Sequence, residues 1–100
     1  MTVVKVIRYT TTKETADENA RLVADVYDEL ATTKPKGLRY ATFRLDDGVS
    51  FVHVALLEEG ENPLNTSAAF AEFQSDIKSR VTEGPVTADA TVVGSYRMTD

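Results

Sequence analysis

The chain lacks cysteine and tryptophan, and His53 is its single histidine. The absence of cysteine excludes disulfides, thiolate nucleophiles and Cys-based metal or iron–sulfur sites. One histidine cannot supply an ordinary transition-metal ligand set, unless two copies of His53 meet beside a dimer axis. Glu58, Glu59 and Glu61 form an acidic loop that could meet a hard cation, but such runs are usually solvated surface. We therefore expect no metal site and no cofactor.

Basic residues are also scarce, with 11 Lys and Arg against 16 Asp and Glu, for a formal charge of −5. The densest basic stretch is Lys34-Pro35-Lys36, and there is neither an aromatic RNA-binding strand motif nor a Gly-rich phosphate loop, so we expect no nucleic-acid partner. No apolar run approaches the roughly 20 residues that span a bilayer. The segment from Met1 to Tyr9 is too short and too polar in its continuation to be a signal peptide. These features predict a cytoplasmic protein without a membrane partner.

The composition that remains is that of one globular domain spanning residues 1–100, since 42% of the residues are hydrophobic. Two- and three-to-four-residue periodicities predict a strand at Val3–Tyr9, a helix from about Thr15 to Lys34, and a second helix whose stripe is Phe70, Phe73, Ile77 and Val81. Lys34-Pro35-Lys36-Gly37 should end the first helix, and Glu83-Gly84-Pro85 the second. Asp46-Asp47-Gly48 predicts a hairpin between strands Leu38–Leu45 and Ser50–Glu58. The last strand is expected within Val86–Met98.

The order β-α-β-β-α-β predicts an α+β, ferredoxin-like fold, with two helices on one face of a four-stranded antiparallel sheet. Alternate side chains of a strand point to opposite faces, and here both faces carry apolar residues. We place Ala41, Phe43, Leu45, Val52, Val54 and Leu56 under the helices. The opposite set, which contains Phe51, His53, Tyr40, Arg44 and Tyr9, would form the open face. Such a face is not left in water, so we expect a homodimer through the open sheet face.

The sequence resembles the dimeric α/β-barrel superfamily, and within it the small proteins related to antibiotic-biosynthesis monooxygenases. The resemblance rests on the element order and on Asn62-Pro63-Leu64, Phe70-Ala71-Glu72-Phe73 and Glu83-Gly84-Pro85. It implies two sheets packed face to face and a pocket in each subunit. Cofactor-free quinone-forming members and haem-degrading members rely on a Trp with Asn or His. This chain has no Trp, and Asn65-Thr66-Ser67-Ala68 has no His, so haem degradation is not expected.

His53 is the one side chain with an ordinary pKa near neutrality, and we expect it close to Tyr40 and Arg44. In the catalytic interpretation His53 is a general base, Tyr40 or Tyr9 holds a phenolic or enolic oxygen, and Arg44 stabilises the developing anion. In the structural interpretation His53 only bonds the partner chain at the interface. The expected walls of an apolar ligand site are Tyr9, Phe51, Phe70 and Phe73, although helical spacing also suits Phe70 and Phe73 to the core.

Two functions remain open. The first is a cofactor-independent, monooxygenase-like enzyme acting on an apolar aromatic or polyketide-like small molecule. The second is a non-catalytic small-molecule-binding or dimeric interaction module. The polar residues on an apolar sheet face favour the first function, and the missing Trp favours the second.

Overall fold

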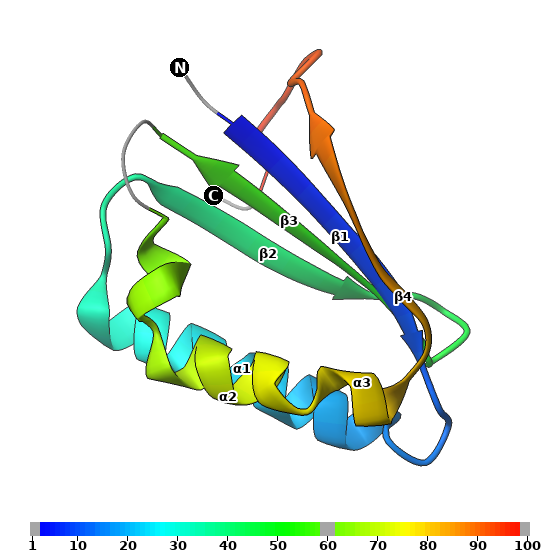
Figure 1. Ribbon diagram of the computed structural model, residues 1–100. Coiled ribbons are helices and arrows are strands. Elements are labelled where there is room, and N and C mark those ends of the chain that lie inside the picture. Colours follow the sequence, from blue (N-terminus) through cyan, green and yellow to red (C-terminus); the bar gives the residue numbers. More distant parts are fainter. Residues whose placement is uncertain (1–2, 59–61, 99–100) are drawn as a thin grey trace.

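The computed structural model describes residues 3–58 and 62–98, which form one layer of sheet and one layer of helices (Figure 1). Glu59 and Glu61 of the predicted acidic loop lie outside the described residues. The elements are β1 (Val3–Thr11), α1 (Ala16–Thr33), β2 (Leu38–Arg44), β3 (Ser50–Leu57), the 3-10 turn η1 (Pro63–Thr66), α2 (Ala68–Ser75), α3 (Ile77–Arg80) and β4 (Val81–Ala90). This order confirms the predicted α+β, ferredoxin-like fold.

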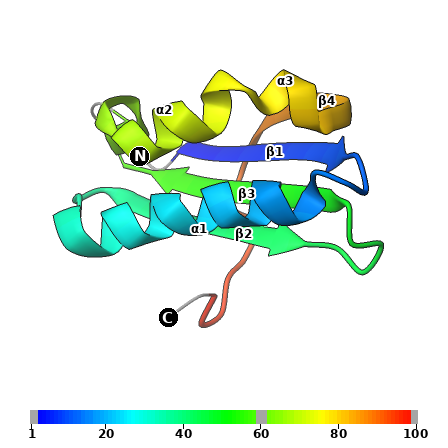
Figure 2. The same ribbon diagram turned by 90° about the horizontal axis from the view of Figure 1, so that it is seen from below.

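The four strands pair antiparallel in the order β2-β3-β1-β4, so β3 and β1 occupy the centre of the sheet. Tyr9 lies opposite Phe51, and His53 lies between Ile7 on one side and Thr42 on the other. Helices α1 and α2 run side by side across one face of this sheet (Figure 2). Because directly opposed residues share a face, the register brings β1, β2 and β3 side chains together beneath the helices.

The predicted turns are confirmed. Helix α1 ends at Lys34, whose backbone is left-handed (φ 46°) and whose N–H donates to the Leu30 carbonyl. In the hairpin the Asp47 carboxylate accepts hydrogen bonds from the Ser50 hydroxyl and from the backbone N–H groups of Ser50 and Val49, and these bonds lower its pKa. Ser67 caps α2, because its hydroxyl accepts a hydrogen bond from the N–H of Phe70.

The second helix differs from its prediction. It is interrupted at Asp76 between α2 and α3, and Val81 is not on a helical stripe but begins β4. Gly84 and Pro85 lie inside that strand, where the β1–β4 register shifts between Arg8 and Thr10. Gly84 has φ +88°, and a Cβ there would lie 2.9 Å from the Arg8 carbonyl oxygen. Glycine therefore permits a bulge in the strand at the place where the sequence suggested a helix stop.

The last strand also lies earlier in the chain than the predicted range Val86–Met98, because β4 begins at Val81 and ends at Ala90. Residues 91–98 leave the sheet and cross the face turned away from the helices (Figure 2). Val93 and Tyr96 in this segment are 99% and 83% exposed. The apolar residues that predicted a strand here are consequently surface residues of an irregular segment.

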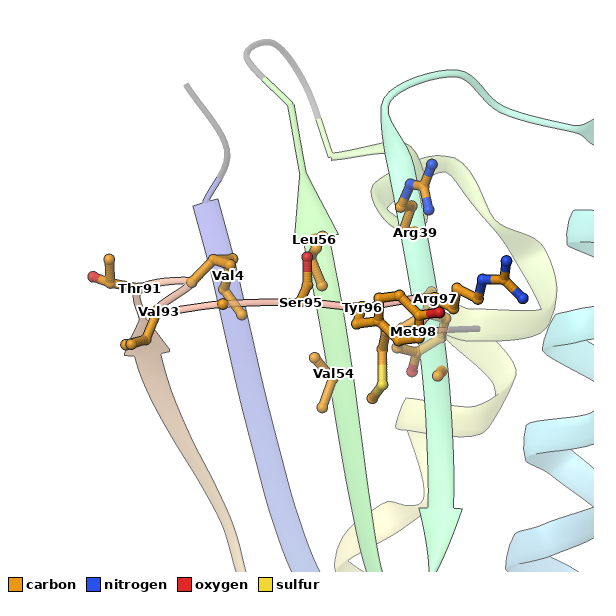
Figure 3. Close-up of a pocket in the computed structure, with 14 residues that line it drawn as sticks. Val4, Arg39, Val54, Leu56, Thr91, Val93, Ser95, Tyr96, Arg97 and Met98 are labelled. Carbon is orange, nitrogen blue, oxygen red and sulfur yellow. The ribbon is translucent and has the colours of Figure 1, made fainter. Parts of the chain in front are cut away.

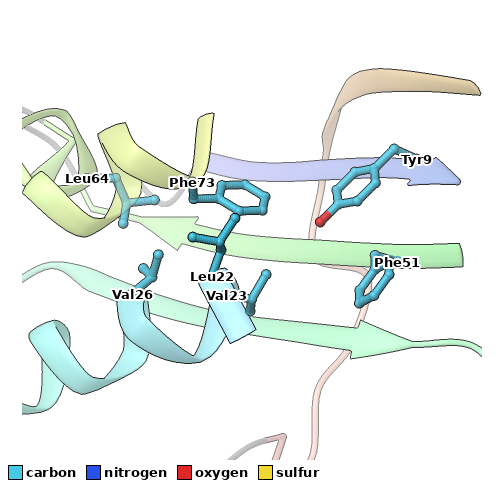
Figure 4. Packing of buried hydrophobic residues seen from close by; sticks show 7 residues of the cluster. All are labelled: Tyr9, Leu22, Val23, Val26, Phe51, Leu64 and Phe73. Carbon is cyan, nitrogen blue, oxygen red and sulfur yellow. The ribbon is translucent and has the colours of Figure 1, made fainter. Parts of the chain in front are cut away.

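The predicted assignment of the two sheet faces is wrong. Phe51 and His53 are each 2% exposed and lie beneath the helices, whereas Val52, Val54 and Leu56 are only partly buried on the open face. The hydrophobic core contains Tyr9, Leu22, Val23, Val26, Phe51, Leu64 and Phe73 (Figure 4). The larger aromatic rings fill the space between sheet and helices, while smaller aliphatic side chains of β3 face the other side.

Candidate active site

A cluster of aromatic rings occupies the layer between sheet and helices. His53 projects from the middle of β3, with its ring centroid 5.3 Å from that of Tyr9, 5.8 Å from Tyr40 and 5.4 Å from Phe73. Tyr27 of α1 stacks on Tyr40 at 5.2 Å. The fold thus joins His53 with Tyr40 and Tyr9, as the sequence predicts, but inside the subunit instead of on an open face.

Both ring nitrogens of His53 are engaged in hydrogen bonds. Nε2 lies 2.8 Å from the Tyr9 hydroxyl, and Nδ1 lies 2.6 Å from the Tyr40 hydroxyl and 3.1 Å from Thr42 Oγ1. Burial lowers the pKa of His53 from 6.5 to about 4, because the charged imidazolium would lose its hydration. His53 is therefore neutral at physiological pH.

The hydrogen bonds continue beyond His53 in both directions. The Tyr9 hydroxyl accepts from Asn19 Nδ2 at 2.8 Å, and Asn19 Oδ1 accepts from Arg80 Nε at 3.1 Å. On the other side, the Thr42 hydroxyl lies 2.7 Å from that of Tyr27. We call the series Arg80, Asn19, Tyr9, His53 and Tyr40 the core hydrogen-bond chain.

The sequence did not single out Asn19 and Arg80, although both are fully buried, at 0% and 2% exposure. Arg80 also donates to the Phe73 carbonyl oxygen at 2.6 Å and lies over the Phe73 ring, 5.4 Å from its centroid. The spacing of Asn19, Val23 and Val26 along the buried stripe of α1 was a signal for Asn19. No comparable signal existed for Arg80, which falls on the short helix that the sequence did not resolve.

The phenols of the site are poor acids. Burial raises the pKa of Tyr9 to about 12, against the opposing effects of the Asn19 hydrogen bond and the Arg80 charge. Burial also raises the pKa values of Tyr40 and Tyr27 above their ordinary value. At neutral pH all three hydroxyls keep their hydrogens and can donate hydrogen bonds.

Arg44 and Phe51 take positions beside the chain. Arg44 Nε donates to the Gly48 carbonyl oxygen at 2.8 Å, and its Nη2 pairs with Asp17 at 3.1 Å. The guanidinium lies over the Phe51 ring, which in turn stacks on Tyr9 at 5.5 Å. The structure therefore does not bring Arg44 to His53 and Tyr40, and its guanidinium ties the hairpin to the start of α1.

Phe70 and Phe73 are adjacent rings of α2, 6.0 Å apart. Phe70 meets Tyr40 edge-on at 6.5 Å, while Phe73 meets Tyr9 at 6.3 Å. Phe73 is 4% exposed and belongs to the core. Phe70 is partly buried and forms the side of the cluster nearest to Tyr40.

Two of the cavities that border this cluster are lined by Tyr40. One of about 330 Å³ opens between α1 and β2 and is lined by Tyr27, Tyr40, Leu30, Ala31, Lys34, Pro35 and Leu38. The other, of about 800 Å³, lies on the open sheet face under residues 91–98 and is bordered by Val4, Val54 and Leu56 (Figure 3). Only the first lies on the helix side of the sheet, where it meets the two stacked phenols. We take it as the candidate ligand cavity and call it the Tyr27–Tyr40 cavity.

Within residues 3–58 and 62–98, no three His, Asp or Glu side chains are grouped closely enough to hold a metal ion. Over the same residues, no helix has the length and apolar character needed to cross a membrane.

No protein-family model and no curated protein matches the sequence. Solved structures do match the fold. SnoaB, a cofactor-independent oxygenase from Streptomyces nogalater, superposes with a TM-score of 0.69 at 17% identity, over 97% of this chain and 98% of that one. A conserved protein from Methanosarcina mazei gives 0.71 at 15% identity, over 90% and 91% of the two chains. A structure described as an antibiotic biosynthesis monooxygenase gives 0.68 at 16% identity, over 94% and 100%. At these identities the likeness establishes the fold.

Proposed function

We propose that this chain, which has the fold seen in antibiotic-biosynthesis monooxygenases, is a cofactor-independent monooxygenase-like enzyme. Its substrate would be an apolar aromatic or polyketide-like small molecule, held in the Tyr27–Tyr40 cavity. The substrate itself would supply the electrons. A phenol of the naphthol type, for example, reacts with O₂ to give a quinone and one water, which balances without an external reductant.

The observation that carries the proposal is the core hydrogen-bond chain inside an aromatic cluster. A core that served packing alone would gain more from apolar side chains, since each buried polar group costs free energy unless it is fully hydrogen-bonded. Here five polar side chains are connected in series, and the last of them, Tyr40, borders a cavity. Convergent polar groups at an otherwise apolar cavity are typical of a ligand site.

In this proposal Tyr40 contacts the substrate oxygen, and His53 holds the Tyr40 hydroxyl in position through Nδ1. Phe70 forms the apolar wall beside Tyr40. Tyr9 and Phe73 pack against the His53 ring, and Phe51 stacks on Tyr9 behind it. Arg44 would have to leave Gly48 and Asp17 to reach an anion here. Tyr40 therefore takes the anion-stabilising role that the sequence suggested for Arg44.

Oxygen uptake and product mass test this proposal. The purified protein, with EDTA present and no flavin added, is incubated with 1-naphthol, and the product is examined for the mass of a naphthoquinone. Tyr40→Phe and His53→Gln are expected to lower turnover at least about tenfold. Tyr96→Phe makes the same chemical change at an 83% exposed site and should leave turnover unchanged. Equal turnover by the wild type and the three variants, or an equal rate in buffer without protein, would refute the proposed enzymatic activity.

We also propose that the protein is a homodimer through the open sheet face, which the structure identifies as the face of Val52, Val54 and Leu56. The neighbouring strands add Phe43 and Val86, exposed by 39% and 51%, so the face is largely apolar, although Arg8 lies between Val52 and Val86 and residues 91–98 cross part of it. A second copy of the chain would cover this face and remove its apolar side chains from water.

Sedimentation equilibrium at micromolar concentration tests the dimer. The expected mass is twice 11.0 kDa, and Val54→Asp, which places a charge in the middle of that face, should shift it to the single-chain value. Glu18→Gln on the exposed side of α1 serves as the control. A wild-type protein that sediments only at 11.0 kDa contradicts the dimer.

The second candidate function is a non-catalytic binding module. It is favoured by one observation, namely that both His53 nitrogens already have partners, so that no free basic nitrogen faces the Tyr27–Tyr40 cavity. Saturable binding of 1-naphthol without oxygen uptake, weakened by Tyr40→Phe, is the result that selects this function over the enzyme.

A further inference from the structure

The core hydrogen-bond chain has a direction that one residue fixes. Arginine carries only donors, so the bond from Arg80 Nε at 3.1 Å identifies its partner atom on Asn19 as the amide oxygen. The Asn19 amide nitrogen must then be the atom 2.8 Å from the Tyr9 hydroxyl, and it donates there. The Arg80 guanidinium therefore fixes the orientation of the Asn19 amide, and the neighbouring hydroxyls do not affect it.

The next step sets the tautomer of His53. The Tyr9 oxygen already accepts from Asn19, and its hydrogen needs an acceptor, for which His53 Nε2 at 2.8 Å is available. If Nε2 carried the hydrogen instead, the Tyr9 hydroxyl would face two donors and its own buried hydrogen would be left without a partner. His53 is neutral, so its single hydrogen is on Nδ1.

Nδ1 then donates to Tyr40, its nearest partner at 2.6 Å, so the hydrogen of the Tyr40 hydroxyl is directed away from His53. The Thr42 hydroxyl forms a further hydrogen bond with the Tyr27 hydroxyl at 2.7 Å, in which either can donate, and it also interacts with the Tyr40 hydroxyl. Tyr27 and Tyr40 both line the cavity of about 330 Å³. The chain therefore ends at the Tyr40 hydroxyl, whose hydrogen is not used by His53, on a residue that lines the cavity.

We infer that the core hydrogen-bond chain makes Tyr40 a fixed hydrogen-bond donor, so that the cavity selects ligands that present an acceptor oxygen, such as a ketone or quinone carbonyl. The inference rests on the proposed ligand cavity and adds the chemical group that it recognises. Arg80 and Asn19 act as positioning residues, since they set the direction of the Tyr40 hydroxyl without touching the ligand. Hydrogen bonds in series polarise one another, and the positive charge at the Arg80 end strengthens donation at the Tyr40 end.

The direction can be reversed by exchanging one side-chain group. In Asn19→Asp the carboxylate cannot donate to Tyr9, and the adjacent Arg80 keeps it ionised. The Tyr9 hydroxyl would then donate to residue 19 and accept from Nε2–H of His53, and Nδ1 would accept from Tyr40. The Tyr40 hydroxyl would then donate its hydrogen to His53, and this hydrogen would no longer be available to a ligand.

Nitrogen-15 NMR reads the direction, because His53 is the only histidine and its two ring nitrogens need no further assignment to a residue. The ligand-free wild type is expected to show a protonated Nδ1 and an unprotonated Nε2, and Asn19→Asp the opposite pattern. Asn65→Asp introduces the same chemical change at an exposed site and should keep the wild-type pattern. A protonated Nε2 in the wild type overturns the inference, and this result is decisive even if Asn19→Asp does not fold.

Ligand selection is tested separately with 1-tetralone and tetralin, which have the same rings and differ in the carbonyl. We expect the wild type to bind 1-tetralone roughly tenfold more tightly than tetralin, as one hydrogen bond allows, and both Tyr40→Phe and Asn19→Asp to remove that difference. Equal affinity of the wild type for both compounds overturns the acceptor selectivity. If neither compound binds, the proposed ligand class fails, whereas the NMR pattern still decides the direction of the chain.

Discussion

The stability of the protein should depend on pH through His53. Its side chain is 2% exposed, and burial lowers its pKa in the folded chain to about 4, from 6.5 when exposed. Between these two values the unfolded chain binds a proton that the folded chain resists. Stability from this group is therefore complete above about pH 6.5 and is lost as the pH falls towards 4.

The magnitude follows from the two pKa values. At 1.36 kcal/mol per pKa unit, the full loss is about 3 kcal/mol, and about 2 kcal/mol of it is reached by pH 5. The groups that contact the ring support this estimate, because Tyr9, Tyr40 and Thr42 are uncharged and Arg80, beyond Asn19, opposes a second positive charge. No carboxylate in the described part of the chain is bonded to His53 to stabilise its charged form.

Urea unfolding of wild type and His53→Gln at several pH values, at one fixed protomer concentration, measures the effect. Carboxylates titrate in both proteins, so the difference between the two stability curves isolates His53. We expect the wild type to lose about 2 kcal/mol more than His53→Gln between pH 7.5 and pH 5. Parallel curves would show that His53 is not held neutral by burial, and the reasoning about its tautomer would lose its basis.

Two further substitutions test local features. The Glu29 carboxylate accepts hydrogen bonds from the Ser67 hydroxyl and from the N–H groups of Ala68 and Ala69 at the start of α2. We therefore expect Glu29→Gln to lower the free energy of unfolding in urea by about 1 kcal/mol. Glu72→Gln, on the exposed side of α2, should lower it by almost nothing. Gly84→Ala should lower the free energy of unfolding by about 3 kcal/mol, because it adds a clash with the Arg8 carbonyl to the strain of a positive φ. Gly48→Ala, where φ is +79° and the surrounding space is open, should lower it by about 1 kcal/mol. Equal losses in the two variants would contradict the clash.

The element order could be predicted from the sequence because each signal was local. Alternation in 38–44 and 50–57 and the Asp-Gly turn between them define a hairpin, and its register places His53 beside Thr42 and Tyr40. The grouping of His53 with Tyr40 followed from that register, and Tyr9 joins them through the pairing of β1 with β3. Proximity within a sheet is thus accessible from sequence, since neighbouring strands fix it.

The end of the second helix could not be predicted in the same way. Gly84-Pro85 ordinarily marks a helix stop, yet here the helix has already ended at Arg80 and the pair lies within β4. What distinguishes the two outcomes is the Arg8 carbonyl, which lies 2.9 Å from where a Cβ of residue 84 would be. That contact joins residues far apart in the chain, and local propensity contains no information about it.

The assignment of the two sheet faces from sequence was wrong for a related reason, and the structure shows which feature would have corrected it. Alternation separates two sets of side chains but does not say which set the helices cover, and here both sets are apolar enough to be buried. The deciding feature was polar: the set with His53, Tyr9 and Tyr40 carries groups that need partners, and α1 offers a buried amide, Asn19, in the middle of its apolar stripe. An interior amide on a helix requires a polar partner on the sheet face that it covers. Matching Asn19 to the face with His53, Tyr9 and Tyr40 would have placed that face under the helices, where Tyr40 lines the cavity.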